Sequence, residues 1–205
     1  MATALDVLPD EFNQSSQLRP IQAAGEWHVL RLLEELGEDP QREGLLRTPQ
    51  RVWQALTCLT DGYAQEAIDV VGDALFEEQY DEMVVTRDIE FYSLCEHHLL
   101  PFFGRVHIGY IPDGKVVGLS KLPRVVDVYS HRLQLQERLT VQIATGLEEA
   151  LEPRGVGVVL EASHLCLMMR GVEKQSSRTM TSSMRGLFKS DDRIRDTLLD
   201  LVHRS

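Results

Sequence analysis

The sequence is poor in cysteine and has no long apolar segment, and each shortage excludes a class of protein. Its 205 residues include only three cysteines, Cys58, Cys95 and Cys166, which are too few and of the wrong parity for a disulfide framework. No basic-then-apolar leader opens the chain. No apolar run approaches the ~18 to 20 residues that cross a bilayer. We therefore expect a cytoplasmic protein that does not span a membrane.

Basic residues are also in deficit, since 21 Lys and Arg face 32 Asp and Glu and the formal net charge is −11. This charge argues against nonspecific binding to nucleic acid or to an anionic membrane, because a basic surface supplies the long-range attraction in both cases. Any polyanionic ligand must therefore bind in a local basic pocket. The length suffices for one well-formed core and is short for two.

The apolar pattern predicts an α+β protein with an antiparallel sheet. Residues 1–20 show weak periodicity, and we expect a flexible arm there. We expect a turn at Pro112–Gly114 to fold the strand from Phe103 back onto Val116–Val117 as a hairpin. The other expected elements are helices over 21–37, from Thr48, over 122–129, 137–151 and 191–202, and strands over 83–92 and from Val156 toward His164.

Two short motifs suggest a metal site. Cys95-Glu96-His97-His98 is answered about seventy residues later by His164-Leu165-Cys166. Cys95 and His98 can turn toward one ion, with Cys166 as the third ligand and zinc as the favoured ion. Three protein ligands leave one tetrahedral position open for water, as in catalytic zinc sites. Zinc lowers the pKa of bound water from ~15.7 to about 7, and His97 and His164 then remain as proton carriers.

Plainer interpretations of these residues stay open at this point. A lone Cys-x-x-His pair is often a chance occurrence, and a buried free cysteine behaves as a small apolar residue. His164 alone would more often be a hydrogen-bonded core histidine than a catalytic one. The second motif, His-x-Cys, favours the metal site.

Four blocks of the sequence closely resemble the GTP cyclohydrolase I family: Phe91–Phe102, Gly118–Arg124, Gln134–Thr140 and His164–Gly171. The resemblance covers roughly residues 21–205. It implies a tunnelling fold, in which an antiparallel sheet has helices packed on one face, with a helical part over 21–80 and a catalytic part over 81–205. It also implies a toroidal homodecamer of two pentameric rings with active sites at subunit interfaces.

The resemblance further implies a reaction, in which GTP and water yield 7,8-dihydroneopterin triphosphate and formate, the first step of tetrahydrofolate and pterin biosynthesis. In family terms, Cys95, His98 and Cys166 are zinc ligands, and His97 and His164 are acid–base residues. The substrate residues are then Glu137 with Gln136 as the guanine anchor, Ser120, Lys121, Arg124 and Arg170 at the triphosphate and ribose, and Arg51 from a neighbouring subunit. A family basic position one helical turn after Arg51 is Gln54 here.

Chemistry fits these roles, although each has an alternative. The Glu137 carboxylate suits guanine because it accepts hydrogen bonds from both the ring N–H and the amine, but it also suits a helix start. Lys121 and Arg124 suit phosphate, but they also suit a solvated helix face. Two other functions compete: a catalytically silent paralogue that binds purine nucleotide, and a nitrile reductase that uses a cysteine nucleophile. The complete set of metal, acid–base and guanine positions favours the cyclohydrolase.

Overall fold

The computed structural model describes residues 20–203, with side chains from Ala24 onward, so the arm expected at 1–20 lies almost wholly outside the described residues. The chain divides into two compact units, one ending at Cys58 and the other beginning at Leu59. Residues 59–80, which we grouped with the helical part, lie in the second unit. No helix in the described part of the chain is both long and apolar enough to cross a membrane.

The first unit contains the two helices expected from the sequence, α1 (Pro20–Glu35) and α2 (Thr48–Cys58). They pack closely because Gly25 has no side chain: a Cβ there would lie 2.1 Å from Cδ2 of Trp53. None of the residues of α2 is buried. Within the described residues, this helix pair therefore has little core of its own.

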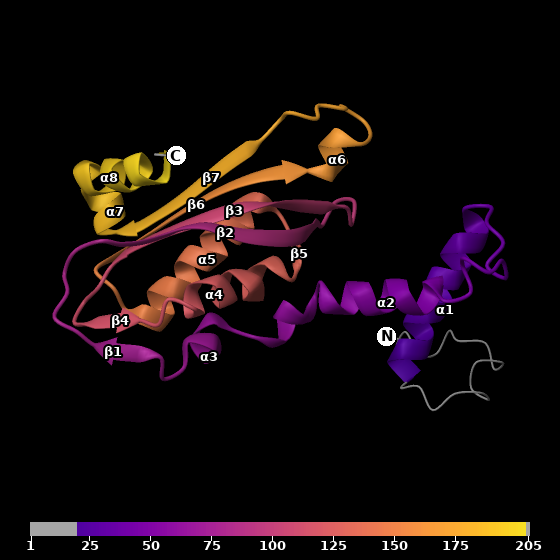
Figure 1. Ribbon diagram of the computed structural model, residues 1–205, viewed down its shortest axis with the longest axis horizontal. Coiled ribbons are helices and arrows are strands. Elements are labelled where there is room, and N and C mark those ends of the chain that lie inside the picture. Colours follow the sequence, from indigo (N-terminus) through magenta and orange to yellow (C-terminus); the bar gives the residue numbers. More distant parts are fainter. Residues whose placement is uncertain (1–19, 204–205) are drawn as a thin grey trace, which may run out of the picture. The chain divides into compact units, whose positions relative to one another are not determined.

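A five-stranded sheet forms the centre of the second unit (Figure 1). In spatial order, its strands are β5 (Leu133–Gln134), β2 (Val84–Cys95), β3 (Pro101–Ile111), β6 (Gly155–His164) and β7 (Thr179–Gly186). Every neighbouring pair is antiparallel except β2 and β5. The expected antiparallel sheet therefore includes one parallel pair, because helix α4 (Lys121–Ser130) returns the chain to the C-terminal end of β2 before β5 begins.

The predicted hairpin between Phe103 and Val117 is wrong. Strand β4 (Lys115–Val117) pairs instead with β1 (Leu75–Glu77) in a separate two-stranded sheet. Both edges of β3 are already occupied at this level, since Tyr110 lies opposite Val84 of β2 and Val156 of β6. The Tyr110 hydroxyl still contacts β4, because it accepts a hydrogen bond of 3.2 Å from the Val117 N–H.

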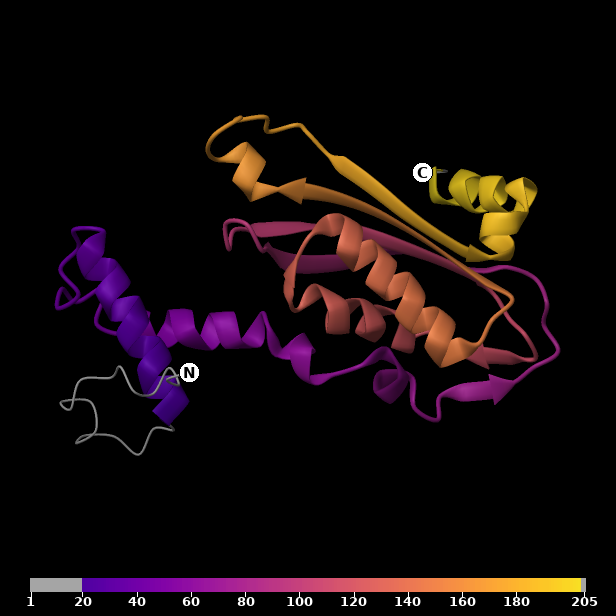
Figure 2. The same cartoon turned by 180° about the vertical axis from the view of Figure 1, so that it is seen from behind.

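Helices cover both faces of the sheet, which corrects our expectation that they would pack on one face only. Helix α4 and helix α5 (Gln136–Leu151) cover one face of the sheet (Figures 1 and 2). This face has the larger core, whose fully buried side chains include Phe102, Ile108, Leu122, Leu139, Ile143, Leu147 and Leu160. The short helix α7 (Leu187–Ser190) and helix α8 (Asp192–His203) pack on the opposite face around Phe188 and Leu198.

Two glycines in the sheet explain why α8 can pack there. A Cβ on Gly109 would lie 2.7 Å from one methyl of Leu198, and a Cβ on Gly157 would lie 2.4 Å from the other. Such distances are too short for real carbon contacts, so glycine on β3 and β6 makes room for the Leu198 side chain. The remaining connections are a 3₁₀ turn (Asp61–Ala64), α3 (Ala67–Val71) and α6 (Leu165–Met168).

We predict that Leu198→Ala lowers the free energy of unfolding by about 2 to 5 kcal/mol, because it empties a fully buried site. The matched control is Leu201→Ala on the same helix, where the side chain is 37% exposed and the loss should be about 0.5 kcal/mol or less. Urea unfolding at one fixed protein concentration compares the two variants. Equal losses would mean that α8 does not pack on the sheet as described.

Candidate active site

The connection between β2 and β3 is a tight turn that presents the first metal motif. The Cys95 N–H donates to the Leu100 carbonyl at 2.9 Å, and the Leu99 N–H donates to the Cys95 carbonyl at 2.8 Å. Leu99 has a φ of 54°, in the left-handed region that costs a non-glycine residue about 1 to 3 kcal/mol. The surrounding hydrogen bonds hold this conformation, and residues 95–98 therefore have a defined shape.

Cys95, His98 and Cys166 come together as the sequence predicted. Their ligand atoms, two sulfurs and one imidazole nitrogen, all lie within 4.8 Å of one another. Cys95 and Cys166 are 5% and 7% exposed, whereas His98 faces solvent. Tetrahedral zinc with bonds of about 2.0 to 2.3 Å spaces its ligand atoms about 3.3 to 3.8 Å apart. A small contraction of the cluster would therefore accommodate the ion.

The electrostatics of the two thiols also fit a cation. Burial raises the pKa of the Cys166 thiol, and the adjacent Cys95 raises it further. Two thiolates side by side in a buried position repel each other and lack hydration. A coordinated divalent cation reverses this preference, because metal-bound thiols lose their protons. The residues present therefore fit a soft divalent metal.

His164 lies at the C-terminal end of β6, two residues before Cys166. Its ring stacks flat on Phe102, with ring centroids 4.6 Å apart and planes 1° from parallel. Its Nε2 lies 2.8 Å from Oε1 of Gln136 in the first turn of α5. Burial lowers the pKa of His164, while the charge of Glu137 raises it. The structure thus brings His164, Gln136 and Glu137 to the same end of the sheet as the cluster.

His97 and Arg170 lie beside the cluster on its exposed side. The rings of His97 and His98 are edge-to-face, with centroids 6.1 Å apart. Nη1 of Arg170 lies 3.4 Å from Nε2 of His98 and donates to the Cys166 carbonyl at 3.5 Å. Both residues are exposed, so they face a ligand that approaches from solvent.

Two residues that the sequence analysis missed, Gln134 and Arg138, have hydrogen bonds and an ion pair that connect the turn after Cys95 to α5. Arg138 forms an ion pair with Glu96, which lies inside the metal motif, and its Nε donates to Oε1 of Gln134 at 3.1 Å. Gln134 is 1% exposed, lies opposite Cys95 in register, and accepts the Glu96 N–H at 3.0 Å through its carbonyl. Both residues stand in the Gln134–Thr140 block, but nothing in the sequence indicates their partners.

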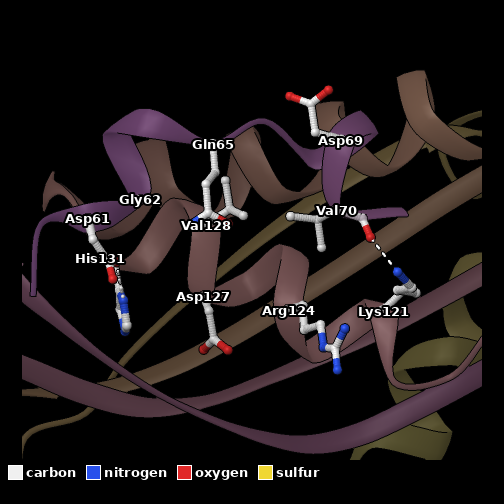
Figure 3. A pocket seen from close by; sticks show the side chains of 10 residues that line it. All are labelled: Asp61, Gly62, Gln65, Asp69, Val70, Lys121, Arg124, Asp127, Val128 and His131. Carbon is white, nitrogen blue, oxygen red and sulfur yellow. Dashed lines mark hydrogen bonds and ion pairs between the residues drawn. The ribbon is translucent and has the colours of Figure 1, made fainter. Parts of the chain in front are cut away.

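The predicted phosphate residues of α4 lie in a different place. Lys121 and Arg124 line a pocket of about 490 Å³ together with Asp61, Gly62, Gln65, Asp69, Val70, Asp127, Val128 and His131 (Figure 3). Nζ of Lys121 donates to the Val70 carbonyl at 2.8 Å. No residue of the cluster lines this pocket. Ser120 is the exposed N-cap of α4, and its side chain makes no capping hydrogen bond.

Three acidic residues also line this pocket, and they make its charge mixed. Asp61 pairs with Nδ1 of His131 at 2.9 Å. Burial raises the pKa of Asp127; the nearby His131 lowers this pKa, and Asp61 raises it. Helix α4 has ten residues, so about 15 Å separate its start at Lys121 from its end near β5 and Cys95. The structure therefore does not bring the basic pair to the cluster. Arg51 is exposed on α2, in the first unit, and its predicted role stays a prediction.

Comparison with known proteins gives three kinds of match. The sequence model of the GTP cyclohydrolase I family matches residues 25–203. "GTP cyclohydrolase 1" of Leptospira biflexa is 58% identical over 171 residues, which cover 83% of this chain and 93% of that protein. "GTP cyclohydrolase 1" of Rattus norvegicus is 56% identical over 171 residues, covering 83% and 71%. A solved structure of archaeosine synthase QueF-Like in the apo form is 20% identical and covers 56% of this chain and 96% of its own, with a TM-score of 0.39.

We predict that each chain binds about one divalent transition-metal ion through the cluster. Cys166→Ser should lose the ion, because a hydroxyl replaces thiolate poorly. Cys58→Ser is the matched control, since Cys58 is exposed and lies outside the cluster, and it should keep the ion. Elemental analysis of the purified proteins measures the metal content. Full metal content in Cys166→Ser would contradict the assignment.

Proposed function

The chain belongs to the GTP cyclohydrolase I family, and we propose that its Cys95, His98 and Cys166 hold a zinc ion in the active site. The protein converts GTP to dihydroneopterin triphosphate. The zinc assignment rests mainly on the cluster itself, because two thiolates and one imidazole form a soft donor set that leaves a coordination position open. When bound, zinc makes water nucleophilic at neutral pH.

Glu137 is the residue that suits recognition of the guanine base. It is exposed in the first turn of α5, near enough to His164 for its charge to raise the pKa of that imidazole. A carboxylate accepts hydrogen bonds from the guanine ring N–H and from the exocyclic amine together. Adenine does not present this pair of donors. Glu137 would thus hold the base with its imidazole ring toward the cluster.

His97 and His164 suit the proton transfers of the reaction. Water adds to the imidazole-ring carbon of guanine, the ring opens to a formamide, and a second hydrolysis releases formate. The sugar then rearranges and closes the pterin ring. Each stage moves protons at nitrogen, carbon or oxygen, and imidazole titrates near neutrality. His164 is held against Phe102 and Gln136, whereas His97 is exposed beside the cluster.

The triphosphate needs cations that the cluster end of one chain does not supply in full. Arg170 lies there, but Lys121 and Arg124 line the separate pocket of α4, and Ser120 is the N-cap of that helix. We propose that another copy of the chain brings these residues, and Arg51, to the triphosphate. Arginine grips phosphate oxygens with two parallel hydrogen bonds, and lysine supplies a point charge. Together they offset the repulsion between the substrate and a chain of charge −11.

Features of the fold support assembly of several copies. In the described sheet, β2 pairs with β5 only at Leu94 and Cys95, so its outer edge before Leu94 is open, and β7 forms the other open edge. Open edges readily pair with another chain. Helix α2 likewise has no buried residue. These features support a closed homo-oligomer. From the family resemblance, we propose that it is a toroidal decamer with a tunnelling fold.

Incubation of the purified protein with GTP and zinc, followed by oxidation, should give pterin fluorescence. We predict that His97→Ala and His164→Ala each slow product formation by about 100-fold or more, the scale of a positioned acid–base group, while zinc and GTP binding persist. His203→Ala, at an exposed position on α8, is the control and should keep the parent rate. Unchanged rates in both active-site variants would place the proton carriers elsewhere.

A second prediction concerns the base. Glu137→Gln keeps the side-chain volume but turns one acceptor oxygen into a donor that faces a donor. A mismatch of this kind costs about 1 to 3 kcal/mol, so GTP affinity should fall by about tenfold or more. Inosine triphosphate lacks the amine and should lose less affinity. Isothermal titration measures both nucleotides.

The matched control for this substitution is Glu149→Gln, which neutralises an exposed carboxylate on the same helix and should leave both affinities unchanged. If Glu137→Gln binds both nucleotides as tightly as the parent protein does, Glu137 serves only the start of α5. The guanine anchor would then have to be another residue.

A further inference from the structure

The side chain of Gln136 is buried and hydrogen-bonded on both sides. It is 2% exposed, although it stands beside the exposed Glu137 at the start of α5. Its Nε2 donates to the carbonyl of Thr179 at 2.9 Å and lies 3.2 Å from Oγ1 of Thr181 and 3.4 Å from the Leu160 carbonyl. Its Oε1 faces Nε2 of His164 at 2.8 Å. The amide therefore connects α5 and β7 to His164.

The two backbone carbonyls fix which way this amide points. Carbonyl oxygens of Leu160 and Thr179 only accept hydrogen bonds, so the group that faces them must be the NH₂ of Gln136. The reversed amide would place its oxygen against two other oxygens in a buried position, where an unpaired polar group is costly. The Gln136 oxygen must then point toward His164.

Two threonines, Thr140 and Thr181, form further hydrogen bonds around Gln136. Oγ1 of Thr140 donates to the backbone carbonyl of Gln136 at 2.8 Å and lies 2.6 Å from Oγ1 of Thr181. Thr181 can thus accept from the Gln136 amide and donate to Thr140. Every polar atom of the Gln136 side chain consequently has a partner inside the protein.

An acceptor oxygen opposite Nε2 of His164 requires a proton on that nitrogen. The neutral imidazole then carries its hydrogen at Nε2, and Nδ1 keeps the lone pair. Stacking on Phe102, which is fully buried, opposes rotation of the ring out of this plane. Nδ1 is therefore the ring nitrogen that remains available to a substrate.

We propose that Gln136 is a positioning residue, which fixes the orientation and the tautomer of His164 so that Nδ1 faces the reaction. This inference rests on the proposed role of His164 as a proton carrier. It replaces the guanine contact that the family resemblance suggested for Gln136 and leaves base recognition to Glu137. The amide acts on the substrate only through the imidazole.

The tautomer is measured directly by ¹⁵N solid-state NMR of full-length protein labelled in its seven histidines, with the His164 signals assigned by their loss in His164→Ala. The parent should show His164 with hydrogen on Nε2. Gln136→Met, which keeps the length of the side chain but removes its oxygen and NH₂, should lose this preference. Zinc content, measured on the same samples, should not change.

Kinetics separate positioning from substrate binding. Gln136→Met should lower kcat by about 10- to 100-fold, the same range as when a metal-ligating imidazole loses the partner that orients it. KM for GTP should stay within about threefold, because the amide makes no contact with the ground-state substrate. Thr145→Val is the matched control on α5, since it loses a hydrogen bond to Arg185 without touching the Gln136 network, and it should keep both constants.

Two results would overturn the inference. One is a parent His164 with hydrogen on Nδ1, a result that needs no variant and holds even if Gln136→Met fails to fold. The other is a tenfold rise in KM with unchanged kcat in Gln136→Met, which would make Gln136 a direct substrate contact. Full activity of His164→Ala would instead remove the proposed role of His164, while the NMR measurement would still decide the tautomer.

Discussion

The pairing register of β2, β3 and β6 is the constraint on which the candidate site depends. Leu94 lies opposite Pro101, and Phe102 lies opposite His164. This register brings the turn after Cys95 to the same end of the sheet as the residues that follow β6, about seventy positions later in the chain. A shift by one residue would turn every side chain of a strand to the other face. The buried residues on both faces of the sheet prevent such a shift.

Three consecutive residues at the start of α5 each have a different place in this site. Gln136 contacts His164, Glu137 is exposed, and Arg138 pairs with Glu96 in the metal motif. Successive residues of a helix point about 100° apart, so one turn can serve an imidazole, a substrate and a metal-bearing loop at once. The position of α5 against β6 and β7 would therefore link the base recognition that we propose for Glu137 to the geometry of the cluster.

Local pattern was enough to predict most helices, the strands β2, β3 and β6, and the three residues of the cluster. Apolar period and turn residues indicate the helices and strands within a few positions of the chain, and the two short motifs of Cys and His indicate the cluster. The partner of β4, the parallel pairing of β5 and the covering of the second face by α8 depend instead on contacts between distant segments. The space that Gly109 and Gly157 leave for Leu198 is one example. Both glycines lie within strands, and nothing in the sequence near them indicates which distant side chain packs there. The hydrogen bonds of Gln136 and Arg138 are similarly invisible in the sequence.

We propose that the metal and base residues of one chain lie beside the phosphate residues of another, and mixing two inactive variants tests this most directly. Cys166→Ser lacks the cluster, and Lys121→Ala lacks a cation of the α4 pocket. Co-assembled in equal amounts, they should recover about a quarter of the parent activity, since half of the clusters are intact and half of those meet an intact pocket. Activity no higher than that of either variant alone, in oligomers shown to contain both chains, would contradict the shared site.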